Sequence, residues 1–384
     1  MVEWKTLNSI VKSISTGLNP RQNFILNEEN ATLYYVTVKE ITSNKVVFSD
    51  STDRITEKAK LVINNRSKLN EGDILFSGIG TIGKVAYVDI PTNNWDCSES
   101  VFLIKPNDSV VKGKFLSYIL SSDIAKNQYE KGAAGAIMKG VRKATLESLL
   151  IPIPSLSEQA RIVGALDTFT VSIDNLKQQI AERRKQYEYY RDQLLDLKGK
   201  EGVEMKTLGD VGEICMCKRI MKDQTSDKGE IPFFKIGTFG GKADAYIARN
   251  LFEEYKNKFS YPKKGDILIS AAGTIGRSVV FDGENAYFQD SNIVWIANDE
   301  TVVSNRYLYY FYQIAAWKTD GGTIKRLYNY NLKNTEIPVP SLSEQSRIVS
   351  ILDTFEASIA NLEAQLELRE KQYEYYRNKL LTFE

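Results

Sequence analysis

One segment of the chain has the glycine spacing of a phosphate-binding loop. Residues 78–85, GIGTIGKV, contain both G-x-G-x-x-G and G-x-x-x-x-G-K. A P-loop also needs Ser or Thr after the lysine to hold magnesium, and Val85 occupies that position. A related stretch at 271–278, AAGTIGRS, lacks the first glycine and has Arg277 in place of Lys84. We therefore interpret GTIG as a tight turn, and the cation after it faces either a phosphate or solvent.

Histidine is absent from the chain, which excludes several kinds of active site. Ser-His-Asp triads, Cys-His dyads and His-ligated zinc all need an imidazole. The three cysteines, Cys97, Cys215 and Cys217, form no disulfide framework, and Cys215-x-Cys217 supplies two ligands where zinc takes four. We expect a non-catalytic chain with no metal and no cofactor of its own. A nucleotide-binding enzyme that uses GIGTIGK is the weakest of three functional hypotheses.

Composition gives little sign of a partner. The 384 residues carry 50 Lys+Arg and 49 Asp+Glu, for a formal net charge of +1, so any nucleic-acid binding must come from local patches. No apolar run reaches the roughly 18 residues that a membrane span needs. Together with the cysteine pattern, this predicts a chain in the reducing cytoplasm with no membrane association.

The chain contains an internal repeat. Residues 151–195 return at 337–381 with about 30 of 45 positions identical. Shorter matches precede them: Lys5-Thr6-Leu7 with 206–208, and GDILFSGIGTIGK (72–84) with GDILISAAGTIGR (265–277). Because the C-terminal part of each half stayed alike while the preceding part diverged, we expect the repeated segments to do one job twice.

Each repeated segment has the pattern of a long helix. Ser155-x-x-Glu158 and Ser341-x-x-Glu344 have the form of capping boxes behind a proline. Apolar residues then follow in steps of three and four, as in a heptad seam about 40 residues or 60 Å long. The predicted seam consists of Ile162, Leu166, Phe169, Ile173, Leu176, Ile180, Tyr187, Tyr190, Leu194, Ile348, Leu352, Phe355, Ile359, Leu362, Leu366, Tyr373, Tyr376 and Leu380.

Arg183 and Arg369 occupy the one skipped position of each seam. Each arginine either fixes the register, lies over a tyrosine ring, or extends its long stem out to solvent. The predicted fold is α+β: two globular mixed α/β domains separated by two long helices, which pack as an antiparallel coiled coil with an internal pseudo-two-fold. The predicted boundaries are 1–150 and 200–336 for the globular domains, and 151–199 and 337–384 for the helical spacers.

This organisation resembles the specificity subunit of type I restriction-modification systems. The residues that carry the resemblance are I-P-x-P-S-L-S-E-Q-x-R-I at the start of each long helix, repeated once, and GTIG before Lys84 and Arg277. The resemblance covers the full chain. It implies that each globular domain is a target-recognition domain that reads one half of a split, asymmetric double-stranded DNA target, and that the helices set the gap between the halves.

The resemblance also implies partners and cofactors. Two methyltransferase subunits, and two restriction subunits in the full complex, would carry S-adenosylmethionine, ATP and Mg. Two basic or polar segments, 132–143 and 321–331, suit phosphate and base-edge contacts, although each also has the composition of a solvated loop. The predicted DNA-binding residues are Lys84, Lys139, Arg142, Lys143, Arg219, Lys222, Arg277, Asn292, Lys325, Arg326, Asn329, Tyr330 and Asn331. The alternative is a coiled-coil scaffold for proteins, without DNA specificity.

Overall fold

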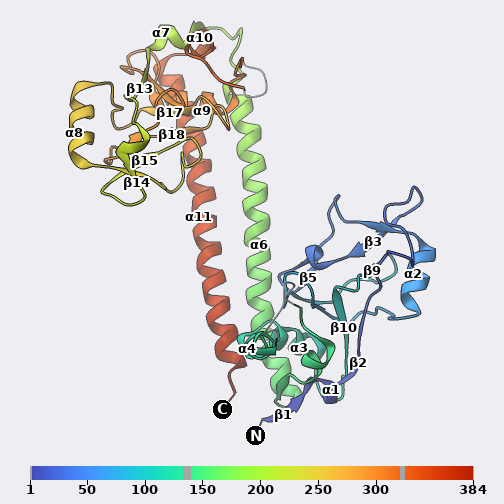
Figure 1. Ribbon diagram of the computed structural model, residues 1–384. Helices are drawn as coiled ribbons and strands as arrows, with labels where there is room; N and C mark the ends of the chain where they lie inside the picture. The colour runs from blue at the N-terminus through green and yellow to red at the C-terminus, as the bar shows by residue number, and fades with distance from the viewer. Residues whose placement is uncertain (1, 133–139, 321–324, 384) are drawn as a thin grey trace. The chain divides into compact units, whose positions relative to one another are not determined.

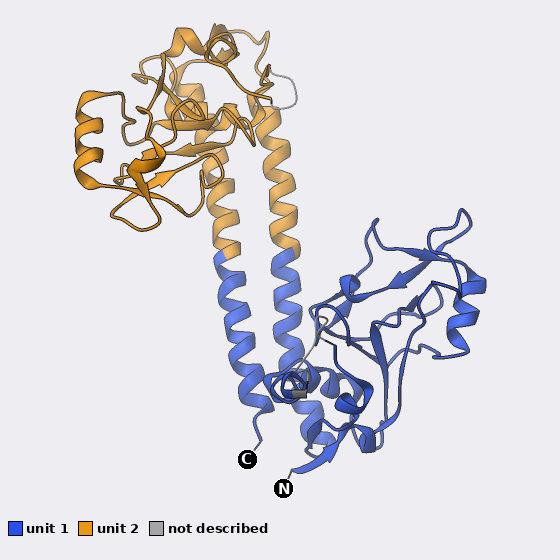
Figure 2. Ribbon diagram, viewed as in Figure 1, with its two compact units in different colours: residues 1–177, 364–384 blue, residues 178–363 orange. Residues whose placement is uncertain are grey.

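The structure is a computed structural model that describes residues 2–132, 140–320 and 325–383. It divides into two compact units (Figure 2): unit 1 comprises residues 1–177 and 364–384, and unit 2 comprises residues 178–363. Each unit contains one globular domain together with a part of both long helices (Figure 1).

Unit 1 contains the N-terminal globular domain. Its elements are β1 (Glu3–Thr6), α1 (Leu7–Ile10), β2 (Val11–Thr16), β3 (Leu33–Val36), the 3-10 helix η1 (Val38–Glu40), β4 (Ile41–Thr42), β5 (Lys45–Val46), β6 (Arg54–Ile55), α2 (Glu57–Asn64), β7 (Ile74–Ser77), β8 (Val85–Tyr87), β9 (Trp95–Cys97), β10 (Val101–Pro106), α3 (Gly113–Leu120), α4 (Asp123–Gly132), α5 (Lys143–Glu147), β11 (Leu150–Ile153) and the start of α6 (Leu156–Leu195).

The main sheet of unit 1 is antiparallel, with the strand order β2-β10-β7-β8. Its central strands β7 and β10 are almost entirely apolar, as expected for strands that are covered on both faces. One face packs on α3 and the start of α6 in a single core. A smaller sheet, β6-β3-β9, covers the other side, with β3 and β9 parallel.

Unit 2 contains the second globular domain. Its elements are β12 (Glu204–Thr207), α7 (Leu208–Val211), β13 (Glu213–Met216), the 3-10 helix η2 (Lys222–Gln224), β14 (Thr225–Ser226), β15 (Ile231–Phe234), β16 (Tyr246–Ile247), α8 (Arg249–Lys258), β17 (Ile267–Ser270), β18 (Ser278–Val280), β19 (Tyr287–Phe288), β20 (Ile293–Ala297), α9 (Asn305–Ile314), α10 (Asn329–Lys333), β21 (Glu336–Val339) and the start of α11 (Leu342–Leu381).

The two globular domains share one topology. The main sheet of unit 2 has the order β13-β20-β17-β18, which repeats that of unit 1 strand for strand. The ladder before the long helix also repeats in register: Lys5 is opposite Ile151 in β1–β11, and Lys206 is opposite Ile337 in β12–β21. The smaller sheets differ, because unit 2 has four strands in the order β14-β16-β15-β19. The predicted α+β fold with two long helices is confirmed.

The interpretation of GTIG as a turn after a short strand is also confirmed. β7 and β17 are the predicted strands, and both glycines of each turn have positive φ. A Cβ atom on Gly83 would lie 2.1 Å from the Tyr129 hydroxyl, and one on Gly276 would lie 2.2 Å from Nε1 of Trp317. Backbone conformation and space therefore both select glycine at these positions.

The predicted capping boxes are half right. The amide of Glu158 donates to the Ser155 hydroxyl, and that of Glu344 donates to Ser341, each at 3.3 Å. The glutamate side chains do not return to the backbone of the serine. Each accepts two hydrogen bonds from the arginine three residues later, at 2.6 to 2.8 Å, because a charged guanidinium is a stronger partner than an amide that water can reach.

The glutamine directly after each of these glutamates, Gln159 or Gln345, is fully buried and attaches the long helix to the globular domain. The Gln159 side chain donates to the carbonyls of Val110 and Pro154 and accepts from the amide of Lys112. In unit 2, Gln345 makes the same three bonds with Val302, Pro340 and Ser304, at 2.9 Å each. We call each such glutamine, with its three bonds, the glutamine clamp.

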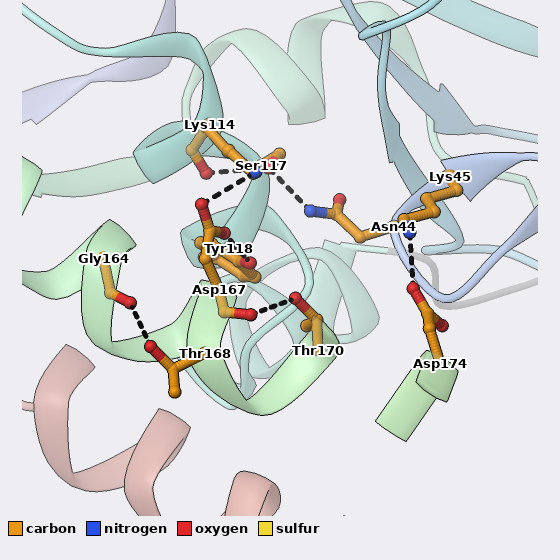
Figure 3. A network of polar contacts seen from close by, with 10 residues as sticks. All are labelled: Asn44, Lys45, Lys114, Ser117, Tyr118, Gly164, Asp167, Thr168, Thr170 and Asp174. Carbon is orange, nitrogen blue, oxygen red and sulfur yellow. Dashed lines mark hydrogen bonds and ion pairs between the residues drawn. The ribbon is translucent and has the colours of Figure 1, made fainter. Parts of the chain in front are cut away.

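An aspartate two turns further along holds the helix that follows the main sheet. The Tyr118 hydroxyl donates to Asp167 at 2.6 Å, and the Lys114 ammonium donates to the other oxygen at 2.8 Å (Figure 3). Asp353 likewise accepts from Tyr310 and Arg306 of α9, here with both donors at its Oδ1. Unit 1 adds a contact from β5, where Lys45 pairs with Asp174 at 2.5 Å.

Most of the predicted seam is covered, but it has two kinds of environment. At the start of each helix, Ile162, Leu166, Ile348 and Leu352 are fully buried in a globular core. At the end of each helix, Leu195 and Leu381 are the buried residues, whereas the predicted Leu194 and Leu380 are only half-buried. At both ends of each helix, therefore, residues of the predicted seam pack on a globular domain.

Where the helices pack on each other, they run antiparallel within each unit. In unit 1, Phe169 stacks on Tyr376 with ring centres 5.4 Å apart, and Lys177 pairs with Glu370. Residue numbers therefore increase along α6 where they decrease along α11. Unit 2 repeats the stack with Phe355 and Tyr190 at 5.4 Å. These tyrosines lie at the edge of the seam and are 42% and 46% exposed.

The arginines in the skipped seam positions lie near aromatic rings of the facing helix. Arg183 is 5.8 Å from the centre of the Phe355 ring, and Arg369 is 5.8 Å from that of Phe169. The ring is a phenylalanine rather than the tyrosine expected. Such contacts contribute about 0.5–1 kcal/mol at exposed sites.

The glutamine clamp gives a stability prediction. Gln345→Ala removes the three hydrogen bonds of a fully buried side chain and leaves their backbone partners unpaired, so we expect the free energy of unfolding of the full chain to fall by about 2–5 kcal/mol. Ser343→Ala, on the exposed side of the same turn, is the control and should change it by less than about 0.5 kcal/mol. Urea unfolding followed by tryptophan fluorescence measures both. Equal stability of the two variants would contradict the role of the clamp.

Candidate nucleic-acid interface

A cavity of about 630 Å³ in unit 2 collects several of the predicted DNA-binding residues. Its lining includes the loop after β13, the turn between β19 and β20, and the segment before α10, together with residues in and around β14, β15 and β16. The loops bring together Arg219, Lys222, Asn292 and Arg326, which are up to about a hundred residues apart in the sequence. The loop after β13 and the turn before β20 lie side by side, because the end of β13 pairs with the start of β20 in the main sheet.

Arg219 is held from one side only. Its Nε donates to Asp290 at 2.8 Å, and its side chain remains 66% exposed whereas Asp290 is 17% exposed. Within the described part of the chain, this is the one hydrogen bond of the guanidinium. The carboxylate therefore orients the guanidinium and leaves its two terminal amino groups without a hydrogen-bond partner among the described residues; such amino groups are the donors that read guanine or phosphate.

Arg326 is the second oriented arginine. Its Nη2 donates to the side-chain oxygen of Asn292 at 2.7 Å and to the carbonyl of Ser291 at 3.4 Å. Ser291 has a φ of 53°, a left-handed conformation that is uncommon for serine. Strained backbone of this kind tends to occur at functional sites, and here it shapes the turn that carries Asn292.

The rest of the cavity lining contains both acidic and basic side chains, with no excess of positive charge. Lys235 pairs with Asp244 at 2.8 Å, and the Gln289 side chain accepts from the amide of Ile236 at 3.0 Å. Asp227 also lines the cavity. The site is therefore a mixture of donors and acceptors, which suits base-edge recognition better than unspecific attraction of phosphates.

Unit 1 uses the same loops with different side chains. The loop after β2 places the Asn19 amide on the Glu99 carboxylate, which lies in the turn before β10. By strand register Asn19 aligns with Arg219, and Glu99 aligns with Ser291, the residue next to Asp290. Ser98 and Ser100 flank Glu99, with their hydroxyls 2.5 Å apart. One scaffold thus presents an amide in unit 1 and two guanidinium groups in unit 2.

The cations after the GTIG turns are placed elsewhere. The Lys84 ammonium donates to the carbonyl of Val38 at 3.0 Å, and Arg277 donates to the carbonyl of Phe239 at 2.8 Å. Lys84 lines a separate cavity of about 520 Å³ in unit 1, together with the β4–β5 turn and both helices. Both side chains brace a loop in this structure, and contact with phosphate stays a prediction.

The remaining predicted residues lie around the segments that precede α5 and α10. Lys325, Asn329 and the 55% exposed Tyr330 are on the surface. Asp320 accepts hydrogen bonds from the Tyr330 hydroxyl and the Asn331 amide. In unit 1, Arg142 is exposed, Lys143 pairs with Glu147 at 3.5 Å, and Lys139 lies outside the described residues. None of these residues lines the cavity that holds Arg219 and Arg326.

Sequence reasoning missed the residues that orient the arginines. Asp290, Gln289 and Lys235 in unit 2, and Asn19 and Glu99 in unit 1, were not among the predicted residues. The signal available was the run of polar residues, SES at 98–100 and DSN at 290–292, directly before an apolar strand in both halves. In the residues that the structure describes, no group of three His, Cys, Asp or Glu side chains is arranged to hold a metal ion.

These features define a protein with two recognition domains of one fold and different surface chemistry. The model of the type I restriction modification DNA specificity domain matches residues 1–183 and 200–369, so the chain belongs to this family of DNA-recognition subunits. No helix within the described ranges has the length and apolar character for crossing a bilayer.

Two relatives agree with this assignment. A Haemophilus influenzae protein assigned as a type I restriction enzyme specificity subunit is 56% identical over 263 residues, 65% of this chain and 68% of that protein. The EcoR124I/EcoR124II specificity subunit of Escherichia coli is 34% identical over 61% of this chain and 63% of its own length.

The solved structures share the fold at low identity. One comes from a study of complex assembly and conformational transition of the type I R-M system, with a TM-score of 0.62, 20% identity, and coverage of 99% of this chain and 97% of the other. The S subunit from M. genitalium gives a TM-score of 0.60 at 17% identity, with 100% and 97% covered.

The cavity in unit 2 yields a prediction that separates two kinds of contact. Arg326→Ala should relax selectivity at one base pair, with a loss of about 1–3 kcal/mol for the preferred base alone. Lys222→Ala should weaken binding to all sequences and reduce the slope of log K against log salt by about 1.

The measurement is fluorescence anisotropy with the full chain and duplexes of varied sequence and salt. Lys258→Ala, at an exposed lysine of α8 that pairs with Glu254, is the control. If both variants at the cavity behaved like this control, the cavity would not be the DNA-contacting surface.

Proposed function

We propose that each globular domain reads one half of a split DNA target and that the two halves differ in sequence. The observation that carries the proposal is the pair of equivalent loops: Arg219 in unit 2 aligns with Asn19 in unit 1, and each donates to a carboxylate in the turn before β20 or β10. Arginine favours guanine and asparagine favours adenine, so equal scaffolds with these side chains select different base pairs.

The proposal includes a role as the assembly scaffold of a larger complex. The long helices carry nearly the same surface twice, and a duplicated surface suits two copies of one partner, here two methyltransferase subunits. Two restriction subunits would join in the full complex. S-adenosylmethionine, ATP and Mg belong to these partners, and this chain contributes recognition without a catalytic step. Its expected location is the cytoplasm.

Sequencing the methylome of a host that expresses this chain with its methyltransferase tests the proposal. We expect methylated adenines in one asymmetric motif with two specified halves and an unspecified gap. Arg219→Ala, made in the same host, should alter one half and leave the other unchanged, because the two halves contact different domains. A palindromic motif, or methylation without site selectivity in the presence of the partner, would contradict the proposal.

The helices provide a second, geometric test. One heptad is about 10 Å of helix, close to the rise of three base pairs of B-DNA. Inserting seven residues after Ala181 and after Glu367, which are equivalent positions of α6 and α11, should lengthen the gap by about three base pairs and leave both half-sites unchanged. The methylome of the inserted variant gives the gap directly. An unchanged gap would show that the helices do not set the spacing.

A further inference from the structure

The two helical repeats reverse the sign of charge at two aligned positions. Lys177 in α6 aligns with Glu363 in α11, and Arg184 aligns with Glu370. At no other of the 45 aligned positions do the two repeats carry opposite charges: they carry the same charge, or at least one of the two residues is neutral. The two reversals are seven residues apart, so they lie on the same face of each helix.

All four residues take part in ion pairs between the helices. In unit 1, Lys177 pairs with Glu370 at 3.0 Å, and in unit 2, Arg184 pairs with Glu363 at 2.5 Å. In both pairs α6 supplies the cation and α11 supplies the anion. The side chains are between 44% and 60% exposed, so each pair contributes little to stability by itself.

The arrangement has a different consequence for a pair of identical helices. Because the repeats have the same seam, α6 could pack on α6 of a second chain in the same register. Lys177 would then face Arg184 of the other copy, twice. Two α11 helices would likewise place Glu363 opposite Glu370, again twice. Each homotypic pair therefore has two repulsive contacts where the native pair has two attractive ones.

We propose that these four charges are a pairing code that directs each long helix to the other repeat and away from the same repeat of a second copy of the chain. The apolar seam cannot make this choice, because its residues are nearly identical in both repeats. The code acts through the difference in free energy between the α6–α11 pair and the homotypic pairs, and it needs no large stabilisation of the α6–α11 pair itself. Charges that flank coiled-coil seams select partners in the same way.

The expected size of the effect follows from exposed charge contacts. Each such contact changes an equilibrium constant by roughly twofold. Exchanging two native helix pairs for one α6–α6 and one α11–α11 pair removes four attractions and adds four repulsions. The discrimination is therefore on the order of a hundredfold at low salt, and it should largely disappear at 1 M salt, where charges are screened within about 3 Å.

Two variants of the full chain remove the code while keeping ion pairs in the native arrangement. Arg184→Glu with Glu363→Lys reverses one native pair, and Lys177→Glu with Glu370→Lys reverses the other. In each, homotypic pairs become attractive as well. The matched control carries all four substitutions: it reverses both native pairs, leaves α6 negative and α11 positive, and so restores the code with opposite sign.

The readout reports α6–α6 contact directly. If residue 177 faces residue 184 of a second α6, residue 180 lies at the centre of the pair and meets its own copy. Ile180→Cys is therefore added to every chain, which is unfolded, refolded at micromolar concentration in low salt, and oxidised. The disulfide-linked dimer is quantified on a non-reducing gel, and the same chains without Ile180→Cys correct for Cys97, Cys215 and Cys217.

We expect both two-substitution variants to form at least tenfold more disulfide-linked dimer than the chain with native charges. The control with four substitutions should form as little dimer as the chain with native charges. At 1 M salt these differences in dimer should disappear. Equal dimer from all chains would overturn the code. So would a control that dimerises as much as the two-substitution variants, because the effect would then come from the substitutions themselves rather than from their pattern.

Discussion

The attachment of each globular domain to the start of the following helix is the constraint on which the rest of the structure depends. A fully buried glutamine makes three hydrogen bonds with the backbone, and an aspartate two turns later accepts from a tyrosine and a cation. An unsatisfied buried amide or carbonyl is costly, so these bonds permit few alternative angles between domain and helix. Orientation of a recognition surface relative to its helix is set there.

The sequence predicted the repeated parts well and the orienting residues poorly. Seam positions such as Ile162 and Ile348 follow from helical period, and GTIG follows from the properties of glycine. The capping box at Ser155 was half right, because propensity rules do not see that Arg161 competes for Glu158. Gln159 and Gln345 went unnoticed, since a polar residue has no periodic signal that marks it as buried.

The recognition surface shows the same limit. Arg219, Lys222, Asn292 and Arg326 were chosen by residue type, and the fold brings them to one cavity. Lys84 and Arg277 were chosen the same way, yet each is bonded to a backbone carbonyl of a neighbouring loop. Which cation faces a ligand depends on contacts between loops distant in sequence, and single-sequence patterns carry no information on those contacts.

All three hydrogen bonds of each glutamine clamp are made with main-chain atoms. Lys112 in unit 1 and Ser304 in unit 2 supply the same amide although their side chains have nothing in common. The attachment is therefore indifferent to amino-acid replacements in the segment that it grips. Substitutions in the base-reading loops, which are other segments of the domain, also leave these bonds in place. Recognition can therefore change during evolution while the attachment of domain to helix is kept, because its hydrogen-bond partners are backbone atoms and not side chains.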